Sequence, residues 1–350
     1  MRGYLRPAAG LTCLFALAAA GCSSGGTGTT DAAPAQTSRA PRTSAAPSES
    51  ASSSGTSSST SYAPYVSATE ASATDSTGSP TTYNLAFVIS DGTNCTAKWN
   101  GTDAIDKAAV KSRISALKES GASVRVSFGG ASGKELAEVC GSASALAAAY
   151  GAALDAAGST QADFDIEGDA LTDSASVALR SKAIALLQKE RGDLKVSFTL
   201  PVMPSGLDSD GLALLESAND NSVTVSTVNI MTMNYGSSYS GDMGDYAETS
   251  AKATHDQLQD VFGLSSAEAW QGLALTSMIG DNDVANETFS ISDAAQVRAF
   301  AESKKIAWVS MWSTFRDQQC SSGDASSDDA ATNCSGVSQS SGAFAEAFAG

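Results

Sequence analysis

Short apolar runs alternate with longer stretches of helical spacing from residue 62 to the C-terminus. This alternation is compatible with only a few fold classes. The expected strands are 63–67, 83–90, 123–129, 162–167, 195–200, 224–233, 272–277 and 306–312. The expected helices are 104–120, 134–157, 174–190, 210–218, 246–262, 293–303 and 342–348. Strands and helices that follow one another in this order predict parallel βαβ units.

Eight candidate strands in a folded part of about 290 residues predict an α/β protein. They match a closed (β/α)8 TIM barrel better than an open sheet. We therefore assign residues 61–350 to one barrel domain, although no helix is evident between its first two strands. In such a barrel the C-terminal ends of the strands form the functional face, so the residues at those ends are the candidates for chemistry.

The first 60 residues differ in composition from the rest. Residues 1–22 carry Arg2 and Arg6, an apolar run at 11–20 that is too short to span a membrane, and small residues before Cys22. This pattern fits an export signal. It resembles the bacterial lipoprotein processing site, so we expect a lipid anchor on Cys22, with ordinary secretion as the alternative. Residues 23–60 are almost entirely Ser, Thr, Ala, Gly and Pro, which predicts a disordered tether.

The chain carries 38 acidic and 21 basic residues, which gives a formal charge of −17. Such a surface repels phosphate backbones, so nucleic acid is a poor candidate partner. A neutral polymer such as a polysaccharide meets no such penalty.

Four cysteines remain beyond the first 22 residues, an even number that predicts disulfides in an exported chain. Three pairings are possible. We favour Cys95–Cys140, which joins two neighbouring loop regions, and Cys320–Cys334, which closes a short Ser/Asp-rich loop. A zinc site is the alternative, but the chain has no CxxC pair and a single histidine, His255. We expect no metal and no cofactor.

The fourth expected strand ends in DFDIE, with Asp163, Asp165 and Glu167 at alternate positions. Side chains alternate between the two faces of a strand, so the three carboxyls share one face. Buried carboxyls at this spacing raise one another's pKa, and at least one tends to keep its proton at neutral pH. The alternative is a solvated edge strand, which Phe164 and Ile166 disfavour. The pattern therefore predicts a proton-donating site.

Other polar and aromatic residues follow the neighbouring strands. The third strand runs into 127–130, the sixth into 231–236, the seventh into 278–283, and the eighth ends near Trp312. An amide, a phenol and an indole thus join the carboxyls at one rim. Flat aromatic rings suit the apolar faces of sugar rings and polar groups suit their hydroxyls, so this rim predicts a sugar-binding site.

The chain from about residue 62 resembles glycoside hydrolase family 18, the chitinase family, and in particular its compact bacterial members. Residues 160–167, TQADFDIE, match the family's DxxDxDxE with Thr160 in place of the first Asp. Residues 127–130, SFGG, match its SxGG. Residues 231–235, MTMNY, match its Met-rich sixth-strand motif, with Asn234 where relatives often have Asp. Trp312 matches its eighth-strand tryptophan.

The resemblance implies a role for each residue. Glu167 would be the general acid, and Asp165 would hold and stabilise the substrate's 2-acetamido group, whose oxygen attacks the anomeric carbon. Asp163 would share a proton with Asp165, Tyr235 would hydrogen-bond the acetamido oxygen, and Trp312 would form the floor under the sugar. The further substrate contacts that it implies are Met233, Asn234, Gly129 and Gly130.

The activity implied is that of a chitinase that cleaves β-1,4-linked N-acetylglucosamine polymers with retention, acting on chitin or its oligosaccharides as a monomer. One alternative is an endo-β-N-acetylglucosaminidase acting on N-glycans. The other is a non-catalytic chitin-binding lectin, against which an intact Glu167 argues. The short stretch between the seventh and eighth strands favours an open groove and endo-like cleavage.

Overall fold

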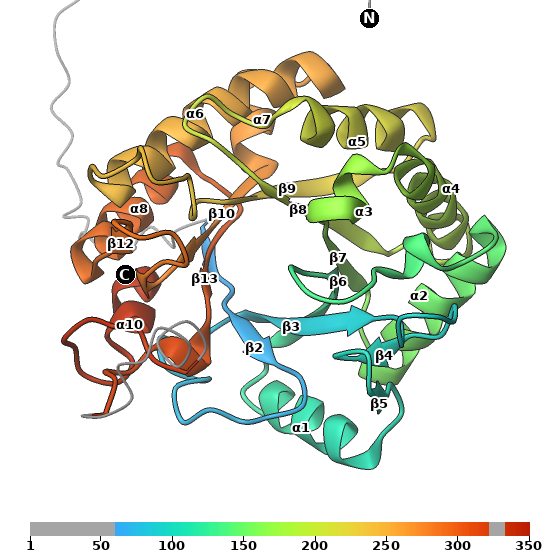
Figure 1. The fold of residues 1–350 in the computed structure, drawn as a ribbon, viewed down its shortest axis with the longest axis horizontal. Coiled ribbons are helices and arrows are strands. Elements are labelled where there is room, and N and C mark those ends of the chain that lie inside the picture. The colour runs from blue at the N-terminus through green and yellow to red at the C-terminus, as the bar shows by residue number, and fades with distance from the viewer. Residues whose placement is uncertain (1–59, 322–332) are drawn as a thin grey trace, which may run out of the picture. The chain divides into compact units, whose positions relative to one another are not determined.

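The structure is a computed structural model that describes residues 60–321 and 333–350. The expected signal segment, its Cys22 and the tether up to residue 59 lie outside the described residues. Parallel strands occupy the centre of the described chain, and helices surround them (Figure 1). The central strands are β1 (Ser61–Tyr62), β2 (Tyr65–Ser67), β3 (Thr82–Ile89), β6 (Ser123–Gly129), β7 (Gln161–Asp165), β8 (Lys195–Pro201), β9 (Val225–Met231), β10 (Leu273–Met278) and β13 (Trp308–Trp312).

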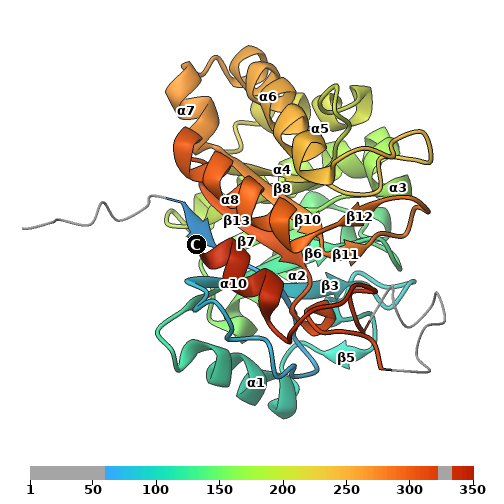
Figure 2. The same ribbon diagram turned by 90° about the vertical axis from the view of Figure 1, so that its left-hand side faces the viewer.

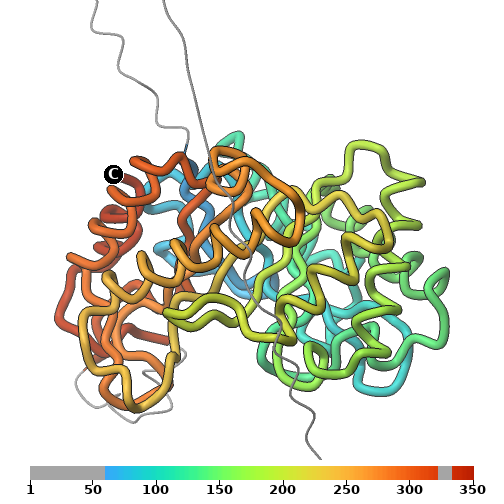
Figure 3. The backbone as a smooth tube through the Cα atoms, turned by 90° about the horizontal axis from the view of Figure 1, so that it is seen from above, coloured from blue at the N-terminus to red at the C-terminus, as the bar shows by residue number. Residues whose placement is uncertain are grey.

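The first stretch of described chain joins the two ends of this sheet. β1 pairs in parallel with β13, and β2 pairs in parallel with β3. Pro64 lies between the two short strands, and because proline has no N–H to donate to a ladder, the expected strand at 63–67 is divided there. Figure 3 shows the blue first strands beside the red end of the chain. The expected α/β TIM barrel is confirmed, with residues 61–67 bridging its ends.

Helices cover the outside of the barrel. They are α1 (Ala108–Lys118), α2 (Ala143–Ala157), α3 (Gly168–Thr172), α4 (Ser174–Glu190), α5 (Ser209–Asp220), α6 (Met243–Phe262), α7 (Ser266–Gln271), α8 (Ile291–Lys304) and α10 (Ala343–Ala349). Many begin at a side chain that satisfies a free backbone N–H of the first turn. Asp173, for example, accepts from Ala175 and Ser176 at the start of α4. The described chain between β2 and β3 holds no helix, as expected.

The helix expected at 134–157 is two elements. The 3-10 helix η1 (Leu136–Glu138) begins at a capping box formed by Glu135 and Glu138, and α2 begins anew at Ser142, whose hydroxyl accepts from Ala145. Between them Cys140 bonds to Cys95. Each N-cap residue starts a separate helix. The continuous apolar spacing therefore wrongly predicted one helix where the chain forms two.

Small antiparallel excursions lengthen two of the loops that follow the barrel strands. After β3 the chain forms β4 (Lys98–Trp99) and β5 (Asp103–Ala104), and after β10 it forms the hairpin of β11 (Gly280–Asp281) and β12 (Thr288–Phe289). Figure 2 shows β5 and the β11–β12 hairpin on the same side of the barrel. A second 3-10 helix, η2 (Thr314–Arg316), follows β13.

Strand β7 separates apolar and acidic side chains in the alternation that its sequence predicts. Phe164 faces the helices, with its ring centroid 5.0 Å from that of Tyr150 in α2. Asp163 and Asp165 face the barrel interior and are buried. Residue 167 lies one step beyond the strand, because β7 ends at Asp165 and α3 begins at Gly168. The interior thus receives carboxyls from the middle and the end of one strand.

Both expected disulfides, Cys95–Cys140 and Cys320–Cys334, are present. Among residues 60–321 and 333–350 no three His, Cys, Asp or Glu side chains are grouped as metal ligands would be. Within the same residues no helix has the length and apolar character needed to span a membrane.

Candidate active site

A pocket opens at the C-terminal ends of the barrel strands. Its lining residues are Tyr65, Phe87, Ala131, Asp165, Glu167, Thr199, Met231, Met233, Asn234, Thr276, Met278, Asp283 and Trp312. They include five of the residues predicted for the site: Asp165, Glu167, Met233, Asn234 and Trp312. Strands that are distant in sequence therefore converge on one cavity, at the end of the barrel where the fold predicts it.

Asp163 lies beneath this pocket and is surrounded by hydroxyl donors. Its Oδ1 accepts from Ser197 at 2.6 Å and from Thr199 at 2.9 Å, and its Oδ2 accepts from Ser127 at 2.7 Å and from Tyr65 at 2.9 Å. The Ser127 of the SFGG stretch is thus a partner of the first interior acid. We expected Asp163 to share a proton with Asp165; in the structure its oxygens bind these four side chains, and the shared proton stays a prediction.

Asp165 and Glu167 form the acidic pair of the pocket. Burial raises the pKa of Asp165 well above its ordinary value, and the charges of Glu167 and Asp163 and a hydrogen bond with Glu167 raise it further. The pKa of Glu167 is also raised, mainly by burial, with the bond to Asp165 opposing the shift and the charge of Asp283 adding to it. The bond thus favours a proton on Asp165 that points toward Glu167, and Oδ1 of Asp165 has no hydrogen-bond partner among the described residues. The pair can store and deliver a proton.

Two glycines hold the end of β6 against the acids. Gly129 and Gly130 have φ of +103° and +90°, and the Gly130 N–H donates to the backbone oxygen of Asp165 at 2.9 Å. A Cβ on Gly129 would overlap that same oxygen, and one on Gly130 would meet the ring of Phe87. Neither glycine is among the lining residues of the pocket, and both let the backbone approach closely, so the expected substrate contact stays a prediction.

An aromatic cluster forms one wall of the pocket. The ring centroids of Trp312 and Phe87 lie 5.5 Å apart with an interplanar angle of 19°, and Tyr65 lies edge-on to Trp312 at 5.9 Å. Phe315 packs edge-on against Trp312 from the other side at 5.7 Å. Aromatic contacts on several sides restrict the indole, which therefore presents a fixed flat surface beside Asp165 and Glu167.

Comparison with known proteins relates this geometry to one family. No family model matches the chain. The chain is 33% identical over 275 residues to a probable bifunctional chitinase/lysozyme of Escherichia coli and to endochitinase 11 of Metarhizium anisopliae. Each match covers 73% of this chain, but it spans only 31% of the first protein and 52% of the second.

The barrel also superimposes on the catalytic domain of a hyperthermophilic chitinase from Pyrococcus furiosus. That likeness has a TM-score of 0.71 and an identity of 28%, and it covers 82% of this chain and 93% of that domain. A GH18 chitinase from Pseudoalteromonas aurantia shares the fold, with a TM-score of 0.53 and 14% identity. The barrel is similar to the chitinases of glycoside hydrolase family 18. Its interior acids, its SFGG stretch and its eighth-strand tryptophan lie together as the family motifs require.

One departure from the family 18 pattern has a visible counterpart. Asn234, which stands where relatives often have Asp, adopts a φ of +53° and donates its Nδ2 to Asp283 Oδ2 at 3.0 Å. Its Oδ1 accepts the Asp283 N–H, also at 3.0 Å. The amide therefore binds a carboxylate from the loop after β10, and a negative charge remains at this edge of the pocket.

The structure corrects the expected position of Tyr235. Its ring is buried and packs against Tyr239 and Tyr246 at 5.9 and 5.7 Å, and its hydroxyl accepts from Ser250 of α6 at 3.4 Å. It does not line the pocket. The left-handed backbone at Asn234 turns the chain, so the residue at the pocket is Met233, two positions earlier.

Two further cavities adjoin the pocket, and each shares some of its lining residues. The first is shared through Glu167, Met231, Met233 and Asn234 and continues over Pro201–Met203 to Asp208. The second is shared through Asp283 and Trp312 and continues past Phe315 toward Ser67–Ala73 and Asn333. Glu167 thus lies at the boundary between the central pocket and one neighbour. The three cavities thus adjoin one another through residues that they share.

Sequence reasoning missed several residues of this site. Tyr65, Phe87, Thr199 and Asp283 line the pocket, yet none was among the predicted site residues. A signal existed for three of them: Tyr65, Phe87 and Thr199 lie at or near the C-terminal ends of expected strands. Asp283 was visible only as part of a polar loop.

Proposed function

We propose that this barrel is a chitinase: it hydrolyses β-1,4-linked N-acetylglucosamine polymers by substrate-assisted catalysis with retention. The observation that carries this proposal is the buried pair of Asp165 and Glu167, in which both carboxyls have raised pKa values beside the fixed indole of Trp312. The likeness of the chain to family 18 chitinases supports the same substrate. One solved chitinase domain from Pyrococcus furiosus is complexed with chito-oligosaccharides.

In this mechanism the proton that Asp165 holds toward Glu167 passes to Glu167, which delivers it to the glycosidic oxygen as the bond to the anomeric carbon breaks and leaves Asp165 ionised. The 2-acetamido oxygen of the same sugar attacks that carbon, as in the family that departs from the two-carboxylate rule. Asp165 accepts the acetamido N–H and stabilises the positive charge of the cyclic intermediate. Water then opens the intermediate, and the Glu167 carboxylate takes up the water's proton. Attack within one molecule avoids the entropy cost of bringing in a nucleophile.

Two cavities beside the central pocket support cleavage within a chain. A polymer that passes Glu167 can place sugars on both sides, with Asp208 lining one of these cavities and Phe315 lining the other. We propose endo-like cleavage on this basis, by a monomeric enzyme of the compact bacterial type, in which only the β11–β12 hairpin and α8 separate β10 from β13.

The test is the release of reducing ends from colloidal chitin and N-acetylglucosamine oligosaccharides, with a high-mannose glycoprotein as the competing substrate. Glu167→Gln should lose at least ~100-fold in kcat on the oligosaccharides while still binding them, because a positioned general acid contributes about that factor or more. Glucosamine at the reacting position should block cleavage. Full activity of Glu167→Gln, or equal cleavage without the acetamido group, would contradict the proposal.

We further propose that the enzyme is exported and anchored through a lipid on Cys22. The N-terminal residues 1–22 and the small-residue tract after them support this, and two disulfides suit an oxidising compartment. Labelling with a fatty acid in the native host should mark the wild-type chain and leave Cys22→Ser unlabelled. A labelled Cys22→Ser variant, or an unlabelled wild type, would contradict the anchor.

A further inference from the structure

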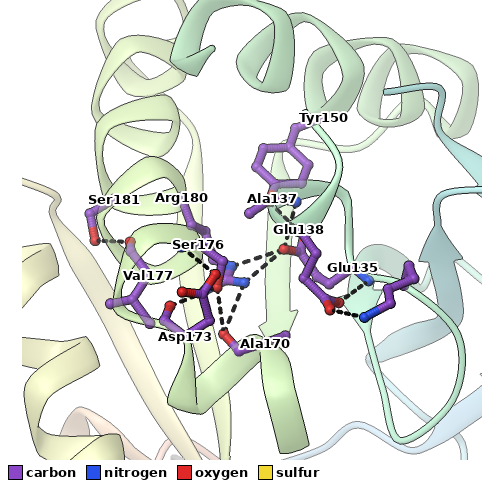
Figure 4. Close-up of polar contacts among 11 residues, drawn as sticks. Glu135, Ala137, Glu138, Tyr150, Ala170, Asp173, Ser176, Val177, Arg180 and Ser181 are labelled. Carbon is purple, nitrogen blue, oxygen red and sulfur yellow. Dashed lines mark hydrogen bonds and ion pairs between the residues drawn. The ribbon is translucent and has the colours of Figure 1, made fainter. Parts of the chain in front are cut away.

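A buried ion pair lies outside the pocket, between the loop after β6 and helix α4 (Figure 4). Arg180 of α4 donates to Glu135 Oε2 through Nη2 at 2.7 Å and through Nε at 3.2 Å. The hydroxyl of Tyr150 donates to Glu135 Oε1 at 2.6 Å. The side chains of Arg180 and Glu135 are 1% and 2% exposed. The mechanism above uses none of these three residues.

The pair connects the two chain segments that flank Glu167. On one side, Nη2 of Arg180 also donates to the carbonyl of Ala170 at 3.3 Å, and the Ser176 hydroxyl donates to the same carbonyl at 3.0 Å. Ala170 belongs to α3, which begins at Gly168, directly after the acid. The guanidinium therefore holds the short helix that carries Glu167 at its N-cap.

On the other side, Glu135 fixes the loop that follows β6. Its Oε2 accepts the N–H of Ala137, and its Cγ lies 3.5 Å from the place that a Cβ on Gly129 would occupy. The same loop contains Gly130, which donates to the backbone oxygen of Asp165, and Ala131, which lines the pocket. The Glu135 carboxylate thus ties the loop to α4 through Arg180, and the loop in turn contacts Asp165 through Gly130.

Stability alone is a weak reason for such a pair. A buried ion pair often contributes nothing over apolar residues of the same size, because the charges lose their hydration. Here, in addition, Nη1 of Arg180 has no hydrogen-bond partner among the described residues, which adds to the cost of burial. What apolar side chains could not supply is a hydrogen bond to the Ala170 carbonyl.

We propose that Arg180, held by Glu135, is a positioning residue for the general acid: by binding the Ala170 carbonyl it sets the direction in which Glu167 presents its carboxyl. The inference rests on the proposed function, in which Glu167 protonates the leaving group. It assigns no contact with substrate to Arg180.

The test compares two leaving groups. Arg180→Lys keeps the charge but cannot reach Glu135 and the Ala170 carbonyl together. We expect kcat on N-acetylglucosamine oligosaccharides to fall about 10- to 100-fold with KM changed less than about 2-fold, since a displacement of ~1 Å costs up to that factor. On a 2,4-dinitrophenyl chitobioside, whose leaving group needs no proton, kcat should fall less than about 3-fold.

A control substitution lies at the other end of the same helix, α4. Arg191, at the C-terminal end of α4, forms a two-pronged pair with Asp155 of α2 at 2.7 and 2.8 Å, far along the helix from Ala170. Arg191→Lys should leave kcat on both substrates unchanged. The double variant Glu135→Met, Arg180→Met removes the pair without stranding a charge, and it should reproduce the kinetics of Arg180→Lys in a folded protein, as judged by circular dichroism.

Equal losses on both substrates, or no loss in either folded variant, would overturn the positioning role. Failure of the proposed function gives a different result: wild-type protein would cleave neither substrate, or Glu167→Gln would show no dependence on the leaving group. If the wild type is active and the loss of kcat in Glu167→Gln depends on the leaving group, the proposed function holds. The results for Arg180→Lys then test the positioning role alone.

Discussion

Replacing Gly129 by alanine tests whether the backbone contact between β6 and β7 aligns the acid pair. A Cβ at this position would meet the backbone oxygen of Asp165 well inside the 3.0 Å that real Cβ atoms respect. That oxygen belongs to the strand that carries Asp165 at its end and is already bonded to Gly130. The new Cβ and the Asp165 backbone oxygen are both fixed to the main chain and cannot swing aside as the end of a flexible side chain could. The ends of β6 and β7 must therefore move apart.

The structure gives the size of the effect. Restoring a distance of 3.0 Å requires a shift of about 1 Å. A shift of that size at reacting groups costs about 100-fold in rate. Because the φ of +103° disfavours a side chain, the substitution should also lower the free energy of unfolding by about 1–2 kcal/mol. We therefore expect Gly129→Ala to fold with reduced stability and to lose about 100-fold in kcat, with KM little changed.

The assay needs a control that separates the close approach from the backbone conformation. Gly92, in the loop after β3, has a φ of +93° and no atom within 4 Å of a Cβ built on it. Gly92→Ala should lose similar stability by thermal unfolding and keep wild-type kcat on N-acetylglucosamine oligosaccharides. If Gly129→Ala keeps its kcat while losing stability like Gly92→Ala, the contact does not align the acids and the reasoning fails.

Three shorter predictions follow from the site. Asp283→Asn removes a charge that raises the pKa of Glu167, so the alkaline limb of the kcat profile should move to lower pH, and less so at high salt; an unchanged limb would contradict this. Tyr235→Phe should change kcat less than ~2-fold, since its ring lies outside the pocket; a tenfold loss would restore its predicted role. Cys95→Ser with Cys140→Ser opens a loop closed across 45 residues and should lower the free energy of unfolding by about 2–4 kcal/mol in urea titration, and no change would contradict it.

The acids were predictable because a strand offers a simple rule. With Phe164 and Ile166 directed to the helices, Asp163 and Asp165 had to face the interior, and the structure has them there. Trp312 was predictable for a similar reason, since the end of a barrel strand reaches the functional face. In both cases the alternation of side chains along the strand and the closure of the barrel place the residue at the same end of the barrel interior.

The remaining site could not be predicted because it depends on single backbone turns and on loops. A left-handed residue at Asn234 decides whether Met233 or Tyr235 enters the pocket, and neither hydropathy nor strand period records it. Asp283 reaches the pocket from a hairpin whose place depends on its bonds to Asn234. The break of the first strand at Pro64, in contrast, could have been predicted, because a residue without an N–H rarely continues a central strand.

The arrangement explains how three carboxyls coexist within five residues without a basic side chain in hydrogen-bonding contact with the first of them. Asp163 receives its hydrogen bonds from four hydroxyls on three surrounding strands, a set that suits a carboxylate. Its negative charge in turn raises the pKa of Asp165, which keeps a proton and directs it toward Glu167. Arg125 lies deeper in the barrel and feels the charge of Asp163 without bonding to it. Hydroxyls stabilise the innermost charge, and the proton is therefore left at the outer pair, where the substrate binds. A lysine at position 127 or 197 would reverse this order, because it would neutralise Asp163 and release the proton from Asp165.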